Sequence, residues 1–325
     1  MYYPNIIEDI CYDSDHIEQV LTEIKLNFHD YFSDFLQSEA GNGLSDDYVV
    51  NLVKHFGNDS QGQVIKKRKK DTKKAFQQII KESIEGYEKD REKYLDIFDE
   101  DVFDEYEDDP NYFKNKVLRD ECPIIRVTIY SNAKELEKYK RDFNLADPND
   151  LLDVVMNLTS FANTYSQNQN SSNYELIDSL EELGFQDLDT GDYIVYGAIG
   201  GGIKSHLLYK LQPAYFPNRS RDAIWALWYL SKKKTFGCLE DSEFLMINVK
   251  ESITQQNYFY PYELFSYYAL KIFQLIEREA MNLNIQLNKD YRFVLVNEFL
   301  SYVASVHSDE INFLKSQLKE ANHGF

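Results

Sequence analysis

The sequence has few cysteines and no long apolar run. Its three cysteines, Cys11, Cys122 and Cys238, are odd in number and widely spaced, which excludes a disulfide scaffold and a cysteine zinc cluster and fits a reducing compartment. No window approaches the about 18 apolar residues of a membrane-spanning helix, and the N-terminus lacks the basic and apolar segments of a signal peptide. We therefore expect a cytoplasmic protein with no membrane partner.

Basic residues are also scarce relative to acidic ones. The 325 residues contain 35 lysines and arginines against 55 aspartates and glutamates, for a formal charge of -20. A surface of this charge repels nucleic acid and anionic membrane as a whole, so any binding of a polyanion has to be local. The chain is 43% hydrophobic, which is enough to form the cores of two domains.

Residues 1–110 are predicted to form a helical, charge-segregated N-terminal region that ends in an acidic linker. Its clearest helix carries an apolar stripe at helical spacing, formed by Ile17, Leu21, Ile24, Phe28, Phe32 and Leu36. The run 66–74 has seven bases and one acid, whereas the run 96–109 has nine acids and no base. We interpret them as a solvated helix face and a flexible linker. The alternatives are a nucleic-acid contact for the basic run and a protein-binding or DNA-mimicking surface for the acidic one.

Residues 120–325 are predicted to form a mixed domain that is mostly helical. The short β-branched runs 124–130 and 244–249 indicate buried strands, and 292–299 is compatible with a strand or a helix. Residues 262–280 are predicted to be a helix whose buried face comprises Leu264, Tyr268, Ile272, Phe273 and Ile276. The predicted fold class is α+β with a helical majority.

The glycine-rich stretch 197–205 raises the question of a phosphate-binding turn. A Walker A loop places a lysine directly after its last glycine, because that lysine has to reach the phosphates. Here Ile203 separates Gly202 from Lys204 and Ser205. This insertion rotates the lysine by about 100° around the helix, which disfavours an NTPase.

The longer stretch Gly197–Leu227 resembles the helix-hairpin-helix segment of the DNA glycosylase superfamily. Ile199 and Gly200 match the turn, Ile203 and residues 205–208 match the second helix, and Pro213, Phe216 and Pro217 match the following corner. The resemblance implies that amide groups at the start of the second helix bind a DNA backbone phosphate. The catalytic aspartate of such glycosylases falls at Ser220 here, with Asp222 two residues further on, so the usual catalytic residue is missing.

A local excess of positive charge surrounds this stretch. Between residues 196 and 239 there are seven bases and the single acid Asp222. Arg219 and Arg221 lie in a turn-like sequence and are expected to be exposed, whereas Trp225 and Trp228 are expected in the core. The predicted nucleic-acid-binding residues are Gly200, Gly201, Gly202, Lys204, Ser205, Arg219, Arg221, Lys232, Lys233 and Lys234.

Catalytic chemistry has only weak candidates. Asp241 and Lys250 fill two positions of a restriction-type metal-dependent nuclease, but Asn248 occupies the place of the second acid. The six histidines show no metal-ligand spacing, so we expect no metal site, and the sequence leaves the question of a cofactor open. The favoured function is nucleic-acid binding in a setting such as DNA maintenance or phage defence. The alternatives are an acidic protein-interaction or DNA-mimic module that uses residues 96–109, and a nuclease.

Overall fold

The structure is a computed structural model that describes residues 10–38, 72–169, 171–234, 236, 244 and 260–321. These residues are 79% helical and 1% strand, with about 12 helices and no sheet. Their β pairing consists of an isolated bridge between Val195 and Ile199. The predicted α+β class is therefore wrong, because the described part of the chain is all-α.

The predicted strand 124–130 is the helix α7 (Pro123–Tyr130). Pro123 occupies its first turn, where the N–H group that proline lacks would have no partner within the helix. The helix packs against η2 and α8, and this packing overrides the β preference of the branched side chains. Ile125 is buried while Val127 is exposed, so a single face is used. The other predicted strand, 244–249, lies outside the described residues except for Phe244. The ambiguous stretch 292–299 is helical.

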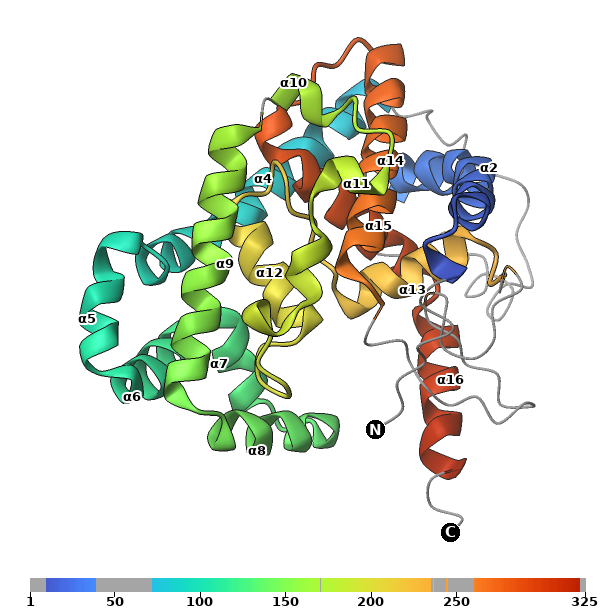
Figure 1. The fold of residues 1–325 in the computed structure, drawn as a ribbon. Coiled ribbons are helices and arrows are strands. Elements are labelled where there is room, and N and C mark those ends of the chain that lie inside the picture. Colours follow the sequence, from blue (N-terminus) through green and yellow to red (C-terminus); the bar gives the residue numbers. More distant parts are fainter. Residues whose placement is uncertain are drawn as a thin grey trace, which may run out of the picture.

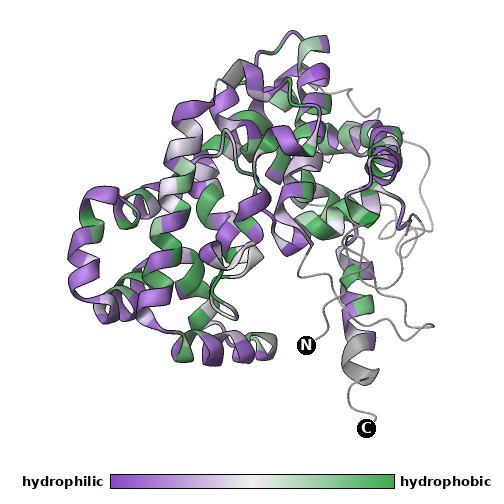
Figure 2. Cartoon of the chain, in the orientation of Figure 1, coloured by the Kyte–Doolittle hydropathy of each residue, from purple (hydrophilic) through white to green (hydrophobic). Residues whose placement is uncertain are grey.

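One half of the molecule is built around α15 (Figure 1). This helix lies against four others: α2, α4, α13 and α14. Figure 2 shows apolar residues gathered where α13, α14 and α15 meet. The five helices are α2 (Ser14–Ser38), α4 (Thr72–Ile97), α13 (Arg221–Leu230), α14 (Tyr262–Asn282) and α15 (Arg292–Val306).

The other half is organised by α9 and α12, which pack on each other. Helix α9 contacts α5, α6 and the π-helix η2, while α12 contacts α4 and α7 and so joins the two halves. The elements of this half are α5 (Phe103–Asp108), α6 (Pro110–Tyr112), η2 (Phe113–Glu121), α7, η3 (Lys134–Leu136), α8 (Glu137–Leu145), α9 (Pro148–Asn168) and α12 (Gly201–Leu211).

Short elements connect these helices. They are η1 (Glu100–Val102), α10 (Ser171–Tyr174), α11 (Leu180–Leu183), η4 (Gln186–Asp189), η5 (Gly191–Tyr193) and η7 (Lys289–Tyr291). The last helix, α16 (Ser308–Ala321), projects from the body (Figure 1). Among the described residues, no helix has the length and apolar character needed to cross a bilayer.

The acidic run 96–109 is a packed helical segment where the sequence predicts a linker. It forms η1 and α5, and α5 lies against α9. Ile97, Phe98 and Phe103 are buried in the same apolar core as α2 and α14, while most of the acids stay exposed. The few apolar residues between the acids are enough to anchor the segment. The division into domains at residues 110–120 stays a prediction.

Candidate functional site

The glycines of the predicted phosphate turn have different structural roles. Gly197 has a φ of +81°, and a Cβ at this position would come within 2.6 Å of the Cβ of Asp142, so only glycine fits. Gly200 is the N-cap of α12, and Gly202 is exposed in its first turn. A Cβ on Gly201 would come within 2.7 Å of an Arg219 guanidinium nitrogen. The middle glycine therefore makes room for an internal arginine.

Lys204 points into the protein. Its side chain is fully buried, and its ammonium donates to the Asp189 carboxylate at 2.6 Å and to the Leu188 carbonyl. Burial lowers the pKa of Lys204, and Asp189 opposes this effect. The second oxygen of Asp189 accepts from the Tyr262 amide at 2.9 Å. Lys204 thus joins α12 to η4 and α14 and is not placed to contact a phosphate outside the protein.

Arg219 is also internal, so the expectation that both arginines are exposed is wrong for this one. It is 5% exposed, and its Nε donates to the Tyr260 carbonyl at 2.7 Å. Its amide donates to Ser205 Oγ at 3.1 Å. Arg221 is exposed as the first residue of α13. Ser220, which stands where a glycosylase has its aspartate, caps α13 by accepting from the Ala223 amide at 3.1 Å.

The three lysines after α13 are exposed, and two of them form ion pairs within the protein. Lys233 pairs with Glu310 and Lys234 with Glu23. Lys232 and Lys233 have φ values of 54° and 59°, because the chain reverses after the helix. The local positive charge of this turn is thus largely balanced by acids of α16 and α2.

The candidate nuclease residues Asp241 and Lys250 lie outside the described residues, as does most of the basic run 66–74. Where the structure describes the chain, no group of three or more histidine, cysteine, aspartate or glutamate side chains could hold a metal ion.

Of the predicted nucleic-acid-binding residues, the structure brings Gly200, Gly201, Lys204, Ser205 and Arg219 together as an internal polar cluster. It leaves Arg221 and the lysine turn outside this cluster.

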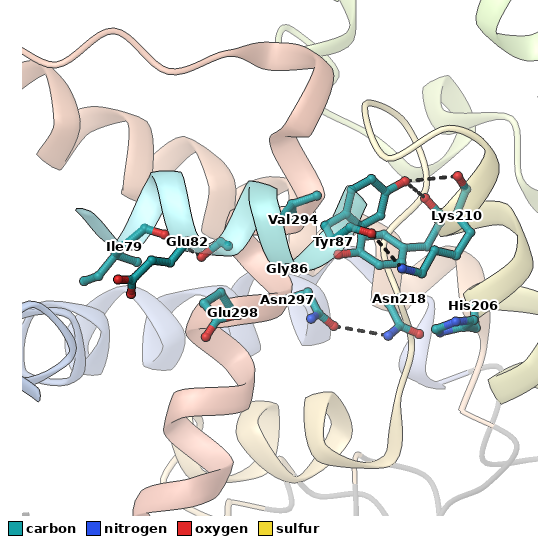
Figure 3. Close-up of a pocket in the computed structure, with 12 residues that line it drawn as sticks. Ile79, Glu82, Gly86, Tyr87, His206, Lys210, Asn218, Val294, Asn297 and Glu298 are labelled. Carbon is teal, nitrogen blue, oxygen red and sulfur yellow. Dashed lines mark hydrogen bonds between the residues drawn. The ribbon is translucent and has the colours of Figure 1, made fainter. Parts of the chain in front are cut away.

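A pocket that the sequence did not predict lies beside this cluster. It has a volume of about 320 Å³ and opens between α4, α12 and α15 (Figure 3). Its wall contains the small residues Ser83 and Gly86, and a Cβ on Gly86 would meet open space. The lining residues are Ile79, Glu82, Ser83, Gly86, Tyr87, His206, Tyr209, Lys210, Asn218, Val294, Asn297 and Glu298.

Side chains from three segments form a hydrogen-bonded relay that ends at this pocket. The Tyr94 hydroxyl accepts from the Ile124 amide at 3.0 Å and forms a second hydrogen bond, of 3.1 Å, with His206 Nε2. The His206 ring also interacts with the Asn218 side chain, and this interaction raises the pKa of His206. Asn218 in turn donates to Asn297 Oδ1 at 3.2 Å. Figure 3 shows Asn218 between His206 and Asn297.

The His206 imidazole is neutral at physiological pH, although its interaction with Asn218 opposes this. Burial, followed by the nearby Lys210 ammonium, lowers the pKa of His206 to about 4. Asn297 lines the pocket, and its side-chain N–H groups make no hydrogen bond to a described residue. These N–H groups can donate to an acceptor on a bound molecule.

The wall next to the relay is rigid. The Lys210 ammonium donates to Asp90 at 2.5 Å and to the Tyr87 carbonyl at 3.1 Å, and it lies 4.6 Å from the centre of the Tyr87 ring. The Tyr87 hydroxyl returns two hydrogen bonds to the Tyr209 and Lys210 carbonyls, at 2.9 and 3.0 Å. These contacts attach the end of α12 to α4 and fix the shape of the pocket.

No family model, curated protein or solved structure matches this chain. The resemblance to the helix-hairpin-helix segment therefore stays a prediction. The pocket residues come from three stretches, 79–87, 206–218 and 294–298, and no motif in the sequence links these stretches.

Proposed function

We propose that the pocket between α4, α12 and α15 binds a small polar molecule. The observation that carries this proposal is the relay from Tyr94 through His206 and Asn218 to Asn297, which ends in a pocket of about 320 Å³. This volume lies at the low end of small-molecule sites, about 300–1,000 Å³. A pocket with a few convergent polar groups and a residue of strongly shifted pKa is the usual form of such a site.

Replacement of Asn297 by alanine should weaken binding of a pocket ligand that carries a hydrogen-bond acceptor. The loss of one neutral hydrogen bond corresponds to about a five- to tenfold rise in Kd. Ligands would be found by a thermal-shift screen of small polar molecules against the whole chain, and their Kd measured by calorimetry.

The matched control is Asn115→Ala, because Asn115 is exposed and its side chain bonds within its own helical segment, to the Asn111 carbonyl at 3.0 Å. Asn115→Ala should leave the Kd unchanged. If every ligand found in the screen bound equally well to Asn297→Ala and to the wild type, the pocket would not be the binding site.

Nucleic-acid binding, the function favoured by the sequence, stays a second proposal. It is supported by the exposed start of α12 at Gly202 and by the exposed Arg221. This proposal no longer includes Lys204, Ser205 and Arg219 as phosphate contacts, because their polar atoms form hydrogen bonds inside the protein. An acidic DNA-mimic module and a nuclease are the remaining alternatives, and no contact in the described part of the chain favours either of them.

Arg221→Ala should reduce the salt dependence of nucleic-acid binding by about one unit, if the side chain contacts one phosphate. Binding would be measured by retention on DNA and RNA columns across a salt gradient, with and without magnesium. Lys89→Ala, an exposed lysine of α4, is the control and should not change the slope. A wild-type protein that elutes without salt-dependent retention would rule this function out.

A further inference from the structure

Tyr209 of α12 is a buried tyrosine whose hydroxyl group has no partner among the described residues. The residue is 4% exposed and lines the pocket. The hydroxyl groups of two other lining residues are used inside the protein: Ser83 donates to the Ile79 carbonyl at 2.7 Å, and Tyr87 donates to two carbonyls of α12. A buried hydroxyl that makes no hydrogen bond costs free energy. A molecule in the pocket can supply the acceptor that Tyr209 lacks.

A second donor comes from α15. The side chain of Asn297 uses its Oδ1 to accept from Asn218 at 3.2 Å (Figure 3), and its N–H groups make no hydrogen bond to a described residue. The pocket is therefore bordered by two donors on two different helices, the Tyr209 hydroxyl and the Asn297 amide. Such a pair suits a ligand that brings hydrogen-bond acceptors.

The surroundings of the Tyr209 oxygen disfavour a negative charge. Burial raises the pKa of Tyr209 well above its ordinary value, and Tyr87 and Glu298, which line the same pocket, add to this effect. An environment that prevents the ionisation of a tyrosine also disfavours a carboxylate or phosphate at the same hydroxyl group. Lys210 is the lining residue with a permanent positive charge, and its ammonium already donates to Asp90 and to the Tyr87 carbonyl.

We propose that the molecule bound in this pocket is uncharged and presents a carbonyl group as the acceptor for the Tyr209 hydroxyl and the Asn297 amide. This inference rests on the proposed function, because it names the chemical class of the ligand for the same pocket. A carbonyl oxygen has two lone pairs, so it can accept two hydrogen bonds. An ammonium group does not match these partners, because the N–H groups of Asn297 cannot accept from it.

The ligand class can be tested with four probes that share a phenyl ring, which suits the apolar lining residues Ile79 and Val294. The probes are acetophenone, α-methylstyrene, in which a CH2 group replaces the carbonyl oxygen, benzoate and benzylamine. Each is titrated into the whole chain at pH 7 and followed by NMR of the probe. We expect acetophenone to bind at least about tenfold more tightly than each of the other three. The inference would be overturned if acetophenone did not bind, or if any other probe bound as tightly.

Removal of the Tyr209 hydroxyl identifies where the carbonyl group lies. Tyr209→Phe should raise the Kd of acetophenone about five- to tenfold and leave that of α-methylstyrene unchanged, because only a donor is lost. Its melting temperature should not fall, since the hydroxyl has no partner among the described residues. Tyr139→Phe is the matched control, because the Tyr139 hydroxyl is also buried without a partner but lies outside the pocket. It should change neither Kd. A folded Tyr209→Phe variant that bound acetophenone as the wild type does would contradict the assignment.

The two proposals fail in different ways. If the screen finds charged ligands whose binding depends on Asn297, and acetophenone does not compete with them, the pocket binds small molecules but the carbonyl class is wrong. If every ligand, acetophenone included, binds equally well to the wild type, Asn297→Ala and Tyr209→Phe, the pocket is not the binding site and both proposals are wrong.

Discussion

Replacing Glu175 by alanine should lower the free energy of unfolding by about 3–5 kcal/mol, because it removes the carboxylate that pairs with the buried guanidinium of Arg292. Arg292 is fully buried, and its Nη2 donates to Glu175 Oε1 at 2.9 Å. Its guanidinium lies 4.8 Å from the centre of the Tyr174 ring and 5.2 Å from that of Phe273. An arginine cannot escape the cost of burial by losing its proton, as a buried lysine can.

A matched control is available on the same carboxylate. Lys289 also pairs with Glu175, but its side chain is 39% exposed, so Lys289→Ala should cost less than about 1 kcal/mol. The double variant Glu175→Leu, Arg292→Met should recover most of the loss, because a well-packed apolar pair can replace a buried ion pair. Urea denaturation of the four proteins measures these differences. If Glu175→Ala were no less stable than Lys289→Ala, Arg292 would not depend on this carboxylate.

The helices with a one-sided apolar pattern could be predicted from the sequence. Every member of the stripe between Ile17 and Leu36 is buried, and so is the predicted face of α14 from Leu264 to Ile276. Trp225 and Trp228 are both in the core, as predicted. In these elements the local pattern and the tertiary packing agree. The spacing of the apolar residues was therefore sufficient to predict which side of each helix is buried.

The functions of individual polar residues could not be predicted in the same way. Lys204 finds its acceptor in Asp189, 15 residues earlier, and Arg219 finds its acceptor in the Tyr260 carbonyl, 41 residues later. A basic residue near a glycine turn looks the same in a sequence whether it faces a phosphate or an internal carbonyl. The sequence therefore indicated an unusual local polar cluster but not the direction of its side chains.

The pocket was missed because its residues share no local signal. Tyr94 and His206, which start the relay, are separated by 112 positions, and Asn218 and Asn297 by 79. Lys204 and His206 are close in sequence, yet they point to different partners, because two positions along an α-helix correspond to a rotation of about 200° around its axis. Only the packing of α12 between its neighbours decides which of these side chains reaches the pocket.

A buried carboxyl group near Asp189, the partner of Lys204, should make stability depend on pH. Glu263, in the first turn of α14, is 5% exposed, and its Oε1 has no hydrogen-bond partner among the described residues. Burial raises the pKa of Glu263 to about 7 from an ordinary 4.5, and the negative charges of Asp189 and Glu181 add to this effect. The folded protein thus holds a proton on Glu263 at pH values where the unfolded chain has lost it.

The sign of the effect follows from this proton. Because the folded pKa is the higher one, the folded state binds more protons between about pH 4.5 and 7, and its stability falls as the pH rises through this window. Above pH 7 the buried group is ionised in both states, and the folded protein bears the full cost of about 3 kcal/mol. Glu263→Gln removes the charge, so we expect the variant to match the wild type near pH 4.5 and to be about 2–3 kcal/mol more stable at pH 8.

Urea denaturation at pH 4.5, 6 and 8 would measure this difference. Glu92→Gln is the control, because Glu92 is exposed on α4, and its stability should follow the wild-type pH profile. A Glu263→Gln variant that differed from the wild type by the same amount at all three pH values would show that its effect is one of packing. A variant less stable than the wild type at pH 8 would show that the ionised carboxylate is stabilised in the folded protein. Only a gain that grows with pH supports a proton held on Glu263 beside Asp189.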